Sequence, residues 1–345
     1  MKPLYLEIIK QFRQEVDAKN AKAVGDLVAG WRDVIEAIMP DMIKLAERVW
    51  KRRDDFSESE LVEMRQYERL LAQLNVLMTK YNLEYAIPLT EEQQRLFAFL
   101  GLEHSTGMAQ AANTKRAIAL SFSRASEDAI RNLIAISRAG QPLRRLFDKA
   151  YPNAAVGLTR QLLIGLGRGI SPRDTAELMM TQGIGQGFNH ILLVARDQQI
   201  RAYRNANQYN YQKLEVGAYR RVAAHNDRTC AACLALDGEI FRTNILMPLH
   251  PQDRCAMVPV FGDFRLGNYS GSGEAWFKAQ SDQVKRKILG PGRLELYNDG
   301  GFKFKQLVSV RNNKIWGPSA RVTSLKNLKR GRGGLKKDKL PTVEF

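Results

Sequence analysis

Apolar residues recur at helical spacing through most of the first 215 residues. Leu4, Ile8, Phe12 and Val16 lie four residues apart, which places them on one face of an amphipathic helix. Two further stripes have spacings mostly of three, four or seven residues: Ile35, Ile38, Met42, Leu45 and Val49, and Leu61, Met64, Leu71, Leu74 and Met78. We expect these faces to form a helical core and surfaces for partner helices rather than a cofactor site.

Local signals predict where individual helices begin and end. Pro40 is expected to kink or split its helix, and Ser57 with Glu60 forms a capping box that starts the next one. Thr90 and Gln93 have the same spacing and predict another helix start, with Gly101 as the stop.

Two glycine-rich segments invite comparison with nucleotide-binding loops. The first, "GLGRG" (165–169), follows no strand and precedes no Lys-Ser/Thr pair, so it does not qualify as a phosphate loop. It is better explained as a helix end, after which Ser171 and Pro172 start the next helix. The second, "TQGIGQGFN" (181–189), is interpreted as another glycine turn.

The pattern changes after residue 215. Short β-leaning runs at 218–225, 238–243 and 256–261 are separated by turn residues, and Asp237-Gly238 is a tight-turn signal. We therefore predict a mainly α protein with a small β-rich module (α+β). Its expected parts are a helical N-terminal region (1–120), a second helical part (121–215), a Cys/His β-rich module with its downstream segment (216–310), and a flexible basic tail (311–345).

Charge is concentrated near the C-terminus. The 345-residue chain has a net charge of +17, and residues 301–345 hold twelve Lys or Arg against two acidic residues. Such a tail would neutralise phosphates without reading base sequence, although a solvated tail that only aids solubility is the alternative. The candidate nucleic-acid contacts are Lys326, Lys329, Arg330, Arg332, Lys336, Lys337 and Lys339.

Composition limits the remaining classes of protein. The chain has no uncharged apolar run near 18 residues, so no membrane span is expected. The first sixteen residues alternate charged and apolar residues, unlike a signal peptide, which favours a cytoplasmic site of synthesis and use. Three cysteines in a long chain argue against a disulfide framework.

The cysteines are the main candidate for chemistry. Cys230 and Cys233 are spaced C-x2-C, and His250 and Cys255 follow with four residues between them. One pair of cysteines followed by a histidine–cysteine pair matches the general design of a structural zinc site. A redox pair is the weaker interpretation because no βαβ unit is visible. Catalysis with His225 as the base, or buried free thiols with His250 capping a turn, also remains open.

The residues around these cysteines resemble a known family. "NDRTCAACLALDGEIF" and "PLHPQDRCAMVPV" are similar to the signature of the phage Mu F-like minor head, or head morphogenesis, family, which runs D-x-R-T-C-x2-C-x4-G and then His-Pro, Cys-Arg-Cys and a short strand. The flanking segments "LLIGLGRGISPRDTAELM", "LLVARDQQIRAYRNANQ" and "WFKAQSDQVKRKILGPGRLELYNDGGFKFKQLV" also follow the family's order. The resemblance covers roughly residues 120–310.

One residue departs from the family pattern. Asp253 replaces the first cysteine of the Cys-Arg-Cys pair. Cys255 can still complete a four-ligand set with Cys230, Cys233 and His250. Alternatively, Asp253 offers an oxygen ligand, or the metal is lost and packing holds the turn together.

The resemblance implies a structural minor head protein of a tailed phage rather than an enzyme. Such a protein joins the procapsid at the portal, lies inside the head, and acts in assembly and in DNA packaging or ejection. The implied partners are the portal protein, the capsid interior or scaffold, and packaged double-stranded DNA. The implied location is the virion interior, after assembly in the host cytoplasm. The alternatives are a C-terminal toxin or nuclease fused to this module, or a cellular zinc-knuckle protein that binds nucleic acid.

Overall fold

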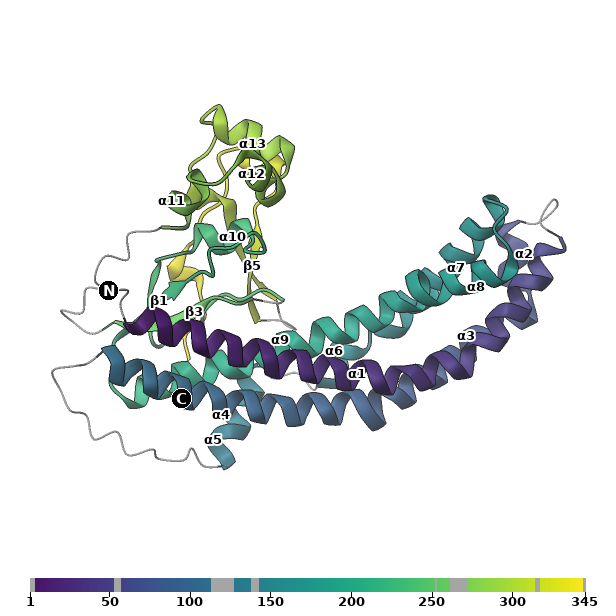
Figure 1. Ribbon diagram of the computed structural model, residues 1–345, viewed down its shortest axis with the longest axis horizontal. Helices are drawn as coiled ribbons and strands as arrows, with labels where there is room; N and C mark the ends of the chain where they lie inside the picture. Colours follow the sequence, from purple (N-terminus) through teal and green to yellow (C-terminus); the bar gives the residue numbers. More distant parts are fainter. Residues whose placement is uncertain are drawn as a thin grey trace. The chain divides into compact units, whose positions relative to one another are not determined.

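The computed structural model describes residues 4–52, 57–112, 127–137, 143–251, 253–260, 272–313 and 317–343. It is mainly helical, with one three-stranded and one two-stranded antiparallel sheet (Figure 1). This confirms the predicted fold class.

Helices account for most of the described chain. They are α1 (Leu4–Trp50), α2 (Glu58–Glu63), α3 (Arg65–Tyr81), α4 (Ile87–Ala112), α5 (Glu127–Ser137), α6 (Leu143–Phe147), α7 (Ala150–Gly167), α8 (Pro172–Leu178), α9 (Gly185–Lys213), α10 (Ala231–Ala235), α11 (Gly273–Lys278), α12 (Asp282–Leu289), α13 (Pro291–Asn298) and α14 (Leu325–Leu328). Two π-helical segments, η2 (Asn82–Ala86) and η3 (Met179–Ile184), and two 3-10 segments, η4 (Phe304–Leu307) and η5 (Lys337–Lys339), complete them.

The chain divides into two compact units. Unit 1 comprises Met1–Asp17, Gln94–Gly140 and Asp197–Phe345, and unit 2 comprises Ala18–Gln93 and Gln141–Arg196. The division of the chain at residues 120, 215 and 310 stays a prediction.

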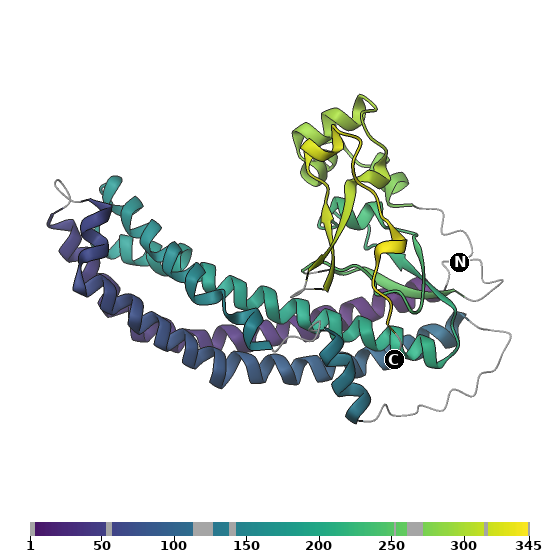
Figure 2. The same cartoon turned by 180° about the vertical axis from the view of Figure 1, so that it is seen from behind.

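Unit 2 is helical, and α7 packs against α3 within it (Figure 2). Apolar stripes supply its core: Ile38, Met42, Leu45 and Val49 of α1 are buried. Pro40 does not split α1, which continues from Leu4 to Trp50 with this proline inside it. The predicted capping box is confirmed, because the backbone nitrogens of Ser57 and Glu60 each donate to the other residue's side chain.

The predicted helix start at Thr90 and stop at Gly101 are both wrong. The π-helical segment η2 joins α3 to α4 without a break, so no free backbone N–H is left for Thr90 to cap. Its hydroxyl donates instead to the carbonyl of Ala86 at 2.7 Å. Gly101 lies inside α4, where an added Cβ would overlap the carbonyl oxygen of Tyr203.

The two glycine-rich segments differ in structure. As predicted, α7 ends at Gly167, Gly169 has a positive φ of 66°, and Ser171 caps α8. The predicted turn at 181–189 is wrong, because η3 runs directly into α9. Gly183 instead allows α7 to approach closely, since a Cβ on Gly183 would lie 2.9 Å from the backbone of Leu158, and one on Gly157 would overlap the carbonyl oxygen of Gly183.

In unit 1, β1 (Ala218–Val222) is the central strand of a three-stranded antiparallel sheet. β2 (Ile240–Arg242) and β3 (Ala256–Val260) flank it, so the order is β2-β1-β3. All three strands lie within the predicted β-leaning runs. A separate hairpin pairs β4 (Val308–Asn313) with β5 (Gly317–Val322).

The expected flexible tail is wrong for residues 317–343. Leu328 is buried with residues of α10, α11 and β4, and Leu340 is buried beside Tyr219, Phe241 and Met247. The last described residues pair with the loop after β2, where Val343 N donates to the carbonyl of Asn244 at 2.7 Å. Apolar residues spaced through the basic segment therefore anchor it to the fold.

Substitution of two helical glycines tests the close approach of α7 to η3. Gly157→Ala is expected to destabilise the protein by about 1–3 kcal/mol through overpacking. Gly25→Ala, at a helical site with nothing within 4 Å of the added Cβ, is expected to stabilise by about 0.8–1 kcal/mol. Urea denaturation of both variants measures this difference. Equal effects of the two substitutions would contradict close packing at Gly157.

Candidate metal centre

Short segments of unit 1 bring the predicted ligands together. Cys230 is the N-cap of α10, and its Sγ accepts from the backbone N–H of Cys233 at 3.4 Å. This cap closes the C-x2-C turn and directs both sulfurs to one side. His250 lies in the loop between β2 and β3, and Cys255 directly precedes β3.

The side chains lie at distances suited to metal coordination. His250 Nε2 is 3.3 Å from Cys230 Sγ and 3.0 Å from Cys233 Sγ. Two groups of three share Cys233: one with Cys230 and His250, the other with Asp253 and Cys255. Within each group the ligand atoms all lie within 4.8 Å of one another. The four predicted ligands therefore lie close together and can bind a metal.

Asp253 adds a carboxylate to this cluster. Its Oδ2 is 3.8 Å from Cys233 Sγ and 3.9 Å from His250 Nε2, and its Oδ1 accepts from the backbone N–H of Cys255 at 2.8 Å. The same Oδ2 forms an ion pair with Arg221, and both side chains are completely buried. Asp253 is thus held mainly by Arg221, which leaves Cys255 as the fourth predicted ligand.

Arg221 is a buried charge beside the cluster that the motif did not reveal. It lies on β1, where its guanidinium donates to Cys233 Sγ at 3.2 Å and to the carbonyl of Pro248. Strand alternation was the available signal, since Arg221 lies on the same side of β1 as the buried Tyr219. A charge at such an inward position requires a partner.

Contacts within the cluster shift the pKa values of its side chains. Burial lowers the pKa of His250, but its hydrogen bond to Cys233 and the nearby negative charges outweigh burial and raise this pKa to about 10. Burial raises the pKa of Asp253, but Arg221 and His250 together hold it below its usual range. The pKa values of Cys233 and Cys255 are also raised, first by a hydrogen bond to a neighbouring sulfur and then by burial. A metal that binds here therefore displaces protons from His250 and from the thiols.

The donor set suits zinc better than a hard cation. Thiolates and imidazole prefer Zn²⁺, whereas Ca²⁺ and Mg²⁺ require oxygen ligands. The three cysteines are free thiols, and Cys233 and Cys255 are buried. The residues present therefore fit a structural zinc ion.

His225, the candidate base, forms a separate pair. Its Nε2 lies 2.6 Å from Asp237 Oδ2, and its ring stacks on Trp276 with centroids 5.8 Å apart. Its backbone φ of +50° is uncommon for a residue other than glycine. Asp237 also accepts from the backbone N–H of Ala223 at 2.6 Å, so this carboxylate holds the start of the Cys-x2-Cys loop.

The predicted nucleic-acid contacts are all exposed on the folded C-terminal segment: Lys326, Lys329, Arg330, Arg332, Lys336, Lys337 and Lys339. Lys337 forms an ion pair with Glu239 at 2.8 Å and lies over the ring of Phe241. The residues are thus surface groups on an ordered scaffold.

No known protein family, curated protein or solved structure matches this chain. Among the described residues, no helix is both long enough and apolar enough to cross a membrane.

Metal content tests the candidate centre. We expect protein purified without chelators to hold about one zinc per chain, measured by inductively coupled plasma mass spectrometry. Cys233→Ser should abolish binding because Cys233 belongs to both groups of ligands. Ser59→Ala, an exposed change far along the chain, is the control and should retain the metal. Metal-free wild-type protein that gains no stability from added zinc would contradict the assignment.

Proposed function

We propose that this chain is a structural minor head protein of a tailed phage that acts at the portal during procapsid assembly and in DNA packaging or ejection. The observation that carries the proposal is the ordered signature from Asp227 to Val260, whose cysteine and histidine side chains converge in one cluster. The upstream segments around α7–α9 and the downstream segment from α11 to η4 follow the order that the resemblance implies. The chain serves assembly and DNA contact rather than substrate turnover.

The proposed zinc ion has a structural role. It is held by Cys230, Cys233, His250 and Cys255, and when bound it links the start of α10 to the loop that leads into β3. These segments are short, and a metal supplies stability that their small core lacks. Arg221 and Asp253 hold the ligand-bearing segments in place from outside the coordination sphere.

Packaged double-stranded DNA is the proposed ligand of the C-terminal segment. The described residues from 272 to 343 contain sixteen Lys or Arg and five Asp or Glu, an excess that favours phosphate contact. A loop that carries Lys329, Arg330 and Arg332 is fixed to the fold, because Gln306 Nε2 donates to the carbonyl of Gly331 at 3.0 Å and Gly334 N to that of Val308 at 2.7 Å. The basic side chains are therefore presented at defined positions.

The helical region is the proposed contact with the portal and with the capsid interior or scaffold. Amphipathic helices bind partner helices through exposed apolar positions. In unit 2, Val28, Val76, Leu83 and Val156 are all exposed by more than 40%. The proposed location is the virion interior near the portal.

Cross-linking mass spectrometry on purified phage particles tests the assignment. We expect this chain at low copy, with links from the helices within residues 1–150 to the portal protein. Procapsids from the same infection provide the comparison, since an assembly factor that leaves on maturation would be present there alone. Absence of the chain from both kinds of particle would refute the proposal.

The salt dependence of DNA binding tests the basic segment. A variant with Lys326, Lys329, Arg330 and Arg332 all changed to Gln should bind duplex DNA more weakly. The slope of log K against log salt should fall by up to about 0.9 for each phosphate that the variant no longer neutralises. The control changes Lys22, Lys44, Arg69 and Lys80 to Gln, which removes the same charge from unit 2. A slope that falls equally in both variants would contradict the assignment of the C-terminal segment as the DNA-binding surface.

A further inference from the structure

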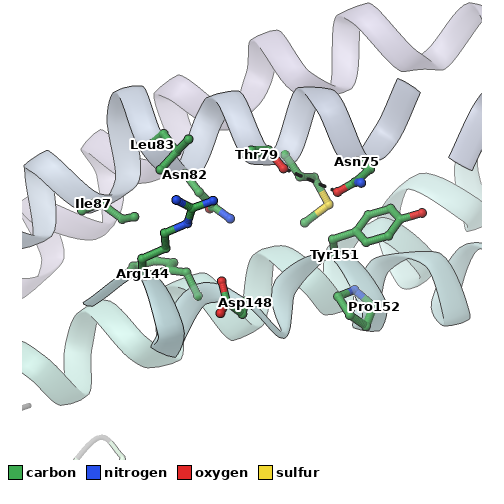
Figure 3. Close-up of a pocket in the computed structure, with 11 residues that line it drawn as sticks. Asn75, Thr79, Asn82, Leu83, Ile87, Arg144, Asp148, Tyr151 and Pro152 are labelled. Carbon is green, nitrogen blue, oxygen red and sulfur yellow. Dashed lines mark hydrogen bonds between the residues drawn. The ribbon is translucent and has the colours of Figure 1, made fainter. Parts of the chain in front are cut away.

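A pocket of about 230 Å³ opens on unit 2 between the α3–η2–α4 helical run and the α6–α7 segment (Figure 3). Side chains from both sides face it. They are Asn75, Met78, Thr79, Asn82, Leu83 and Ile87 from the first side, and Arg144, Phe147, Asp148, Tyr151 and Pro152 from the second. This pocket is separate from the cysteine cluster, and neither the metal nor the DNA proposal uses it.

The pocket has an apolar floor and an exposed apolar margin. Met78 and Phe147 are buried at 0% and 1% exposure, whereas Leu83 is 44% exposed. Val156, which is 68% exposed, follows Pro152 by one helical turn and so lies on the same face of α7. Pockets that enclose drug-sized molecules measure on the order of 300–1,000 Å³. The smaller volume here suits one large apolar side chain of a protein partner.

Two opposite charges flank the apolar floor. Arg144 and Asp148 are four residues apart and both are exposed, a spacing at which such side chains often pair. In the described part of the chain they form no ion pair with each other or with another residue. Both remain available to a partner that carries an acid and a base one helical turn apart.

The π-helical segment η2 forms part of the pocket wall. Asn82 and Leu83 belong to this segment and both line the pocket, and π-helical turns within α-helices are frequent at functional sites. The carboxamide oxygen of Asn82 is buried without a hydrogen-bond partner. Rotation of this amide exchanges oxygen and nitrogen, so Asn82 can offer either an acceptor or a donor to a bound group.

We propose that this pocket docks an α-helix of another protein in the assembling particle. The partner helix inserts one large apolar side chain between α3 and α7, with an acidic residue opposite Arg144 and a basic residue opposite Asp148. The inference deepens the proposed portal contact. It rests on the proposed function, because that proposal identifies the particle in which the partner is sought.

Site-specific photo-cross-linking tests the pocket. p-Benzoylphenylalanine replaces Val76, which is 67% exposed one helical turn from Thr79, or Val62, which is 55% exposed on α2 and serves as the control. In procapsids that contain the chain, we expect the Val76 variant to link to a single segment of one partner and the Val62 variant to give no such link. A charge-reversed Arg144→Glu change should reduce the link at least several-fold. Changing the acid in the linked segment to Lys should restore it, whereas Arg69→Glu, outside the pocket, should have no effect.

The outcomes separate this inference from the proposed function. A link to a segment of the portal protein, rescued by the charge exchange, supports both. A rescued link to a different particle protein supports the pocket and refutes the portal as its partner. If the chain cross-links to the portal elsewhere while the Val76 variant gives no link, or if Arg144→Glu leaves the link unchanged, the docking site is refuted and the proposed function stands.

Discussion

The ion pair between Arg221 and Asp253 holds unit 1 together around the cysteine cluster. Both side chains are completely buried, and removing each charge from water costs several kcal/mol unless the partner is present. Arg221 also bonds the carbonyl of Pro248 and the sulfur of Cys233. A single guanidinium therefore joins β1 to α10 and to the loop before β3. Any arrangement that separates these three segments leaves a charge unpaired in the interior.

A second set of polar contacts comes from α9 and holds segments that have little secondary structure. Gln208 Nε2 donates to the carbonyls of Thr243 and Ile245 at 2.7 and 2.8 Å. Gln212 Nε2 donates to those of Thr243 and Val343 at 2.8 and 3.0 Å. Buried carbonyls outside a sheet need such donors. This requirement explains two of the amides of α9, Gln208 and Gln212.

Much of the fold could be predicted from local sequence, because helices and strands impose periods of 3.6 and 2 residues on their apolar positions. The three β runs, the Ser57 capping box and the C-x2-C…H…C cluster all follow from residues close together in sequence. The errors come from contacts between distant residues. Gly183 marks close packing against Gly157 rather than a turn, and Leu328 and Leu340 anchor a segment whose charge suggested flexibility. No local pattern reports those neighbours.

The pairing of Arg221 with Asp253 was hidden for the same reason. The two residues are 32 positions apart, and the sequence pattern marks Asp253 only as a replaced cysteine or an oxygen ligand. The pocket in unit 2 was also beyond local analysis, because it depends on a π-helical segment and on side chains from two separate parts of the chain. Sequence spacing identified the candidate ligands. The buried ion pair beside them could be recognised only from the fold.

The composition of the two units has a consequence for protein synthesis. Unit 2 ends at Arg196, so it can fold as soon as that residue has emerged from the ribosome. Unit 1 also includes Asp197–Phe345 and can be completed only later. Domains tend to fold as soon as they are complete. Unit 2 is therefore expected to fold first, while Ile9 of α1 waits for Val222 and Val258, which come much later in the chain. During that interval the apolar side of Ile9 that later packs against the sheet is left uncovered on the nascent chain.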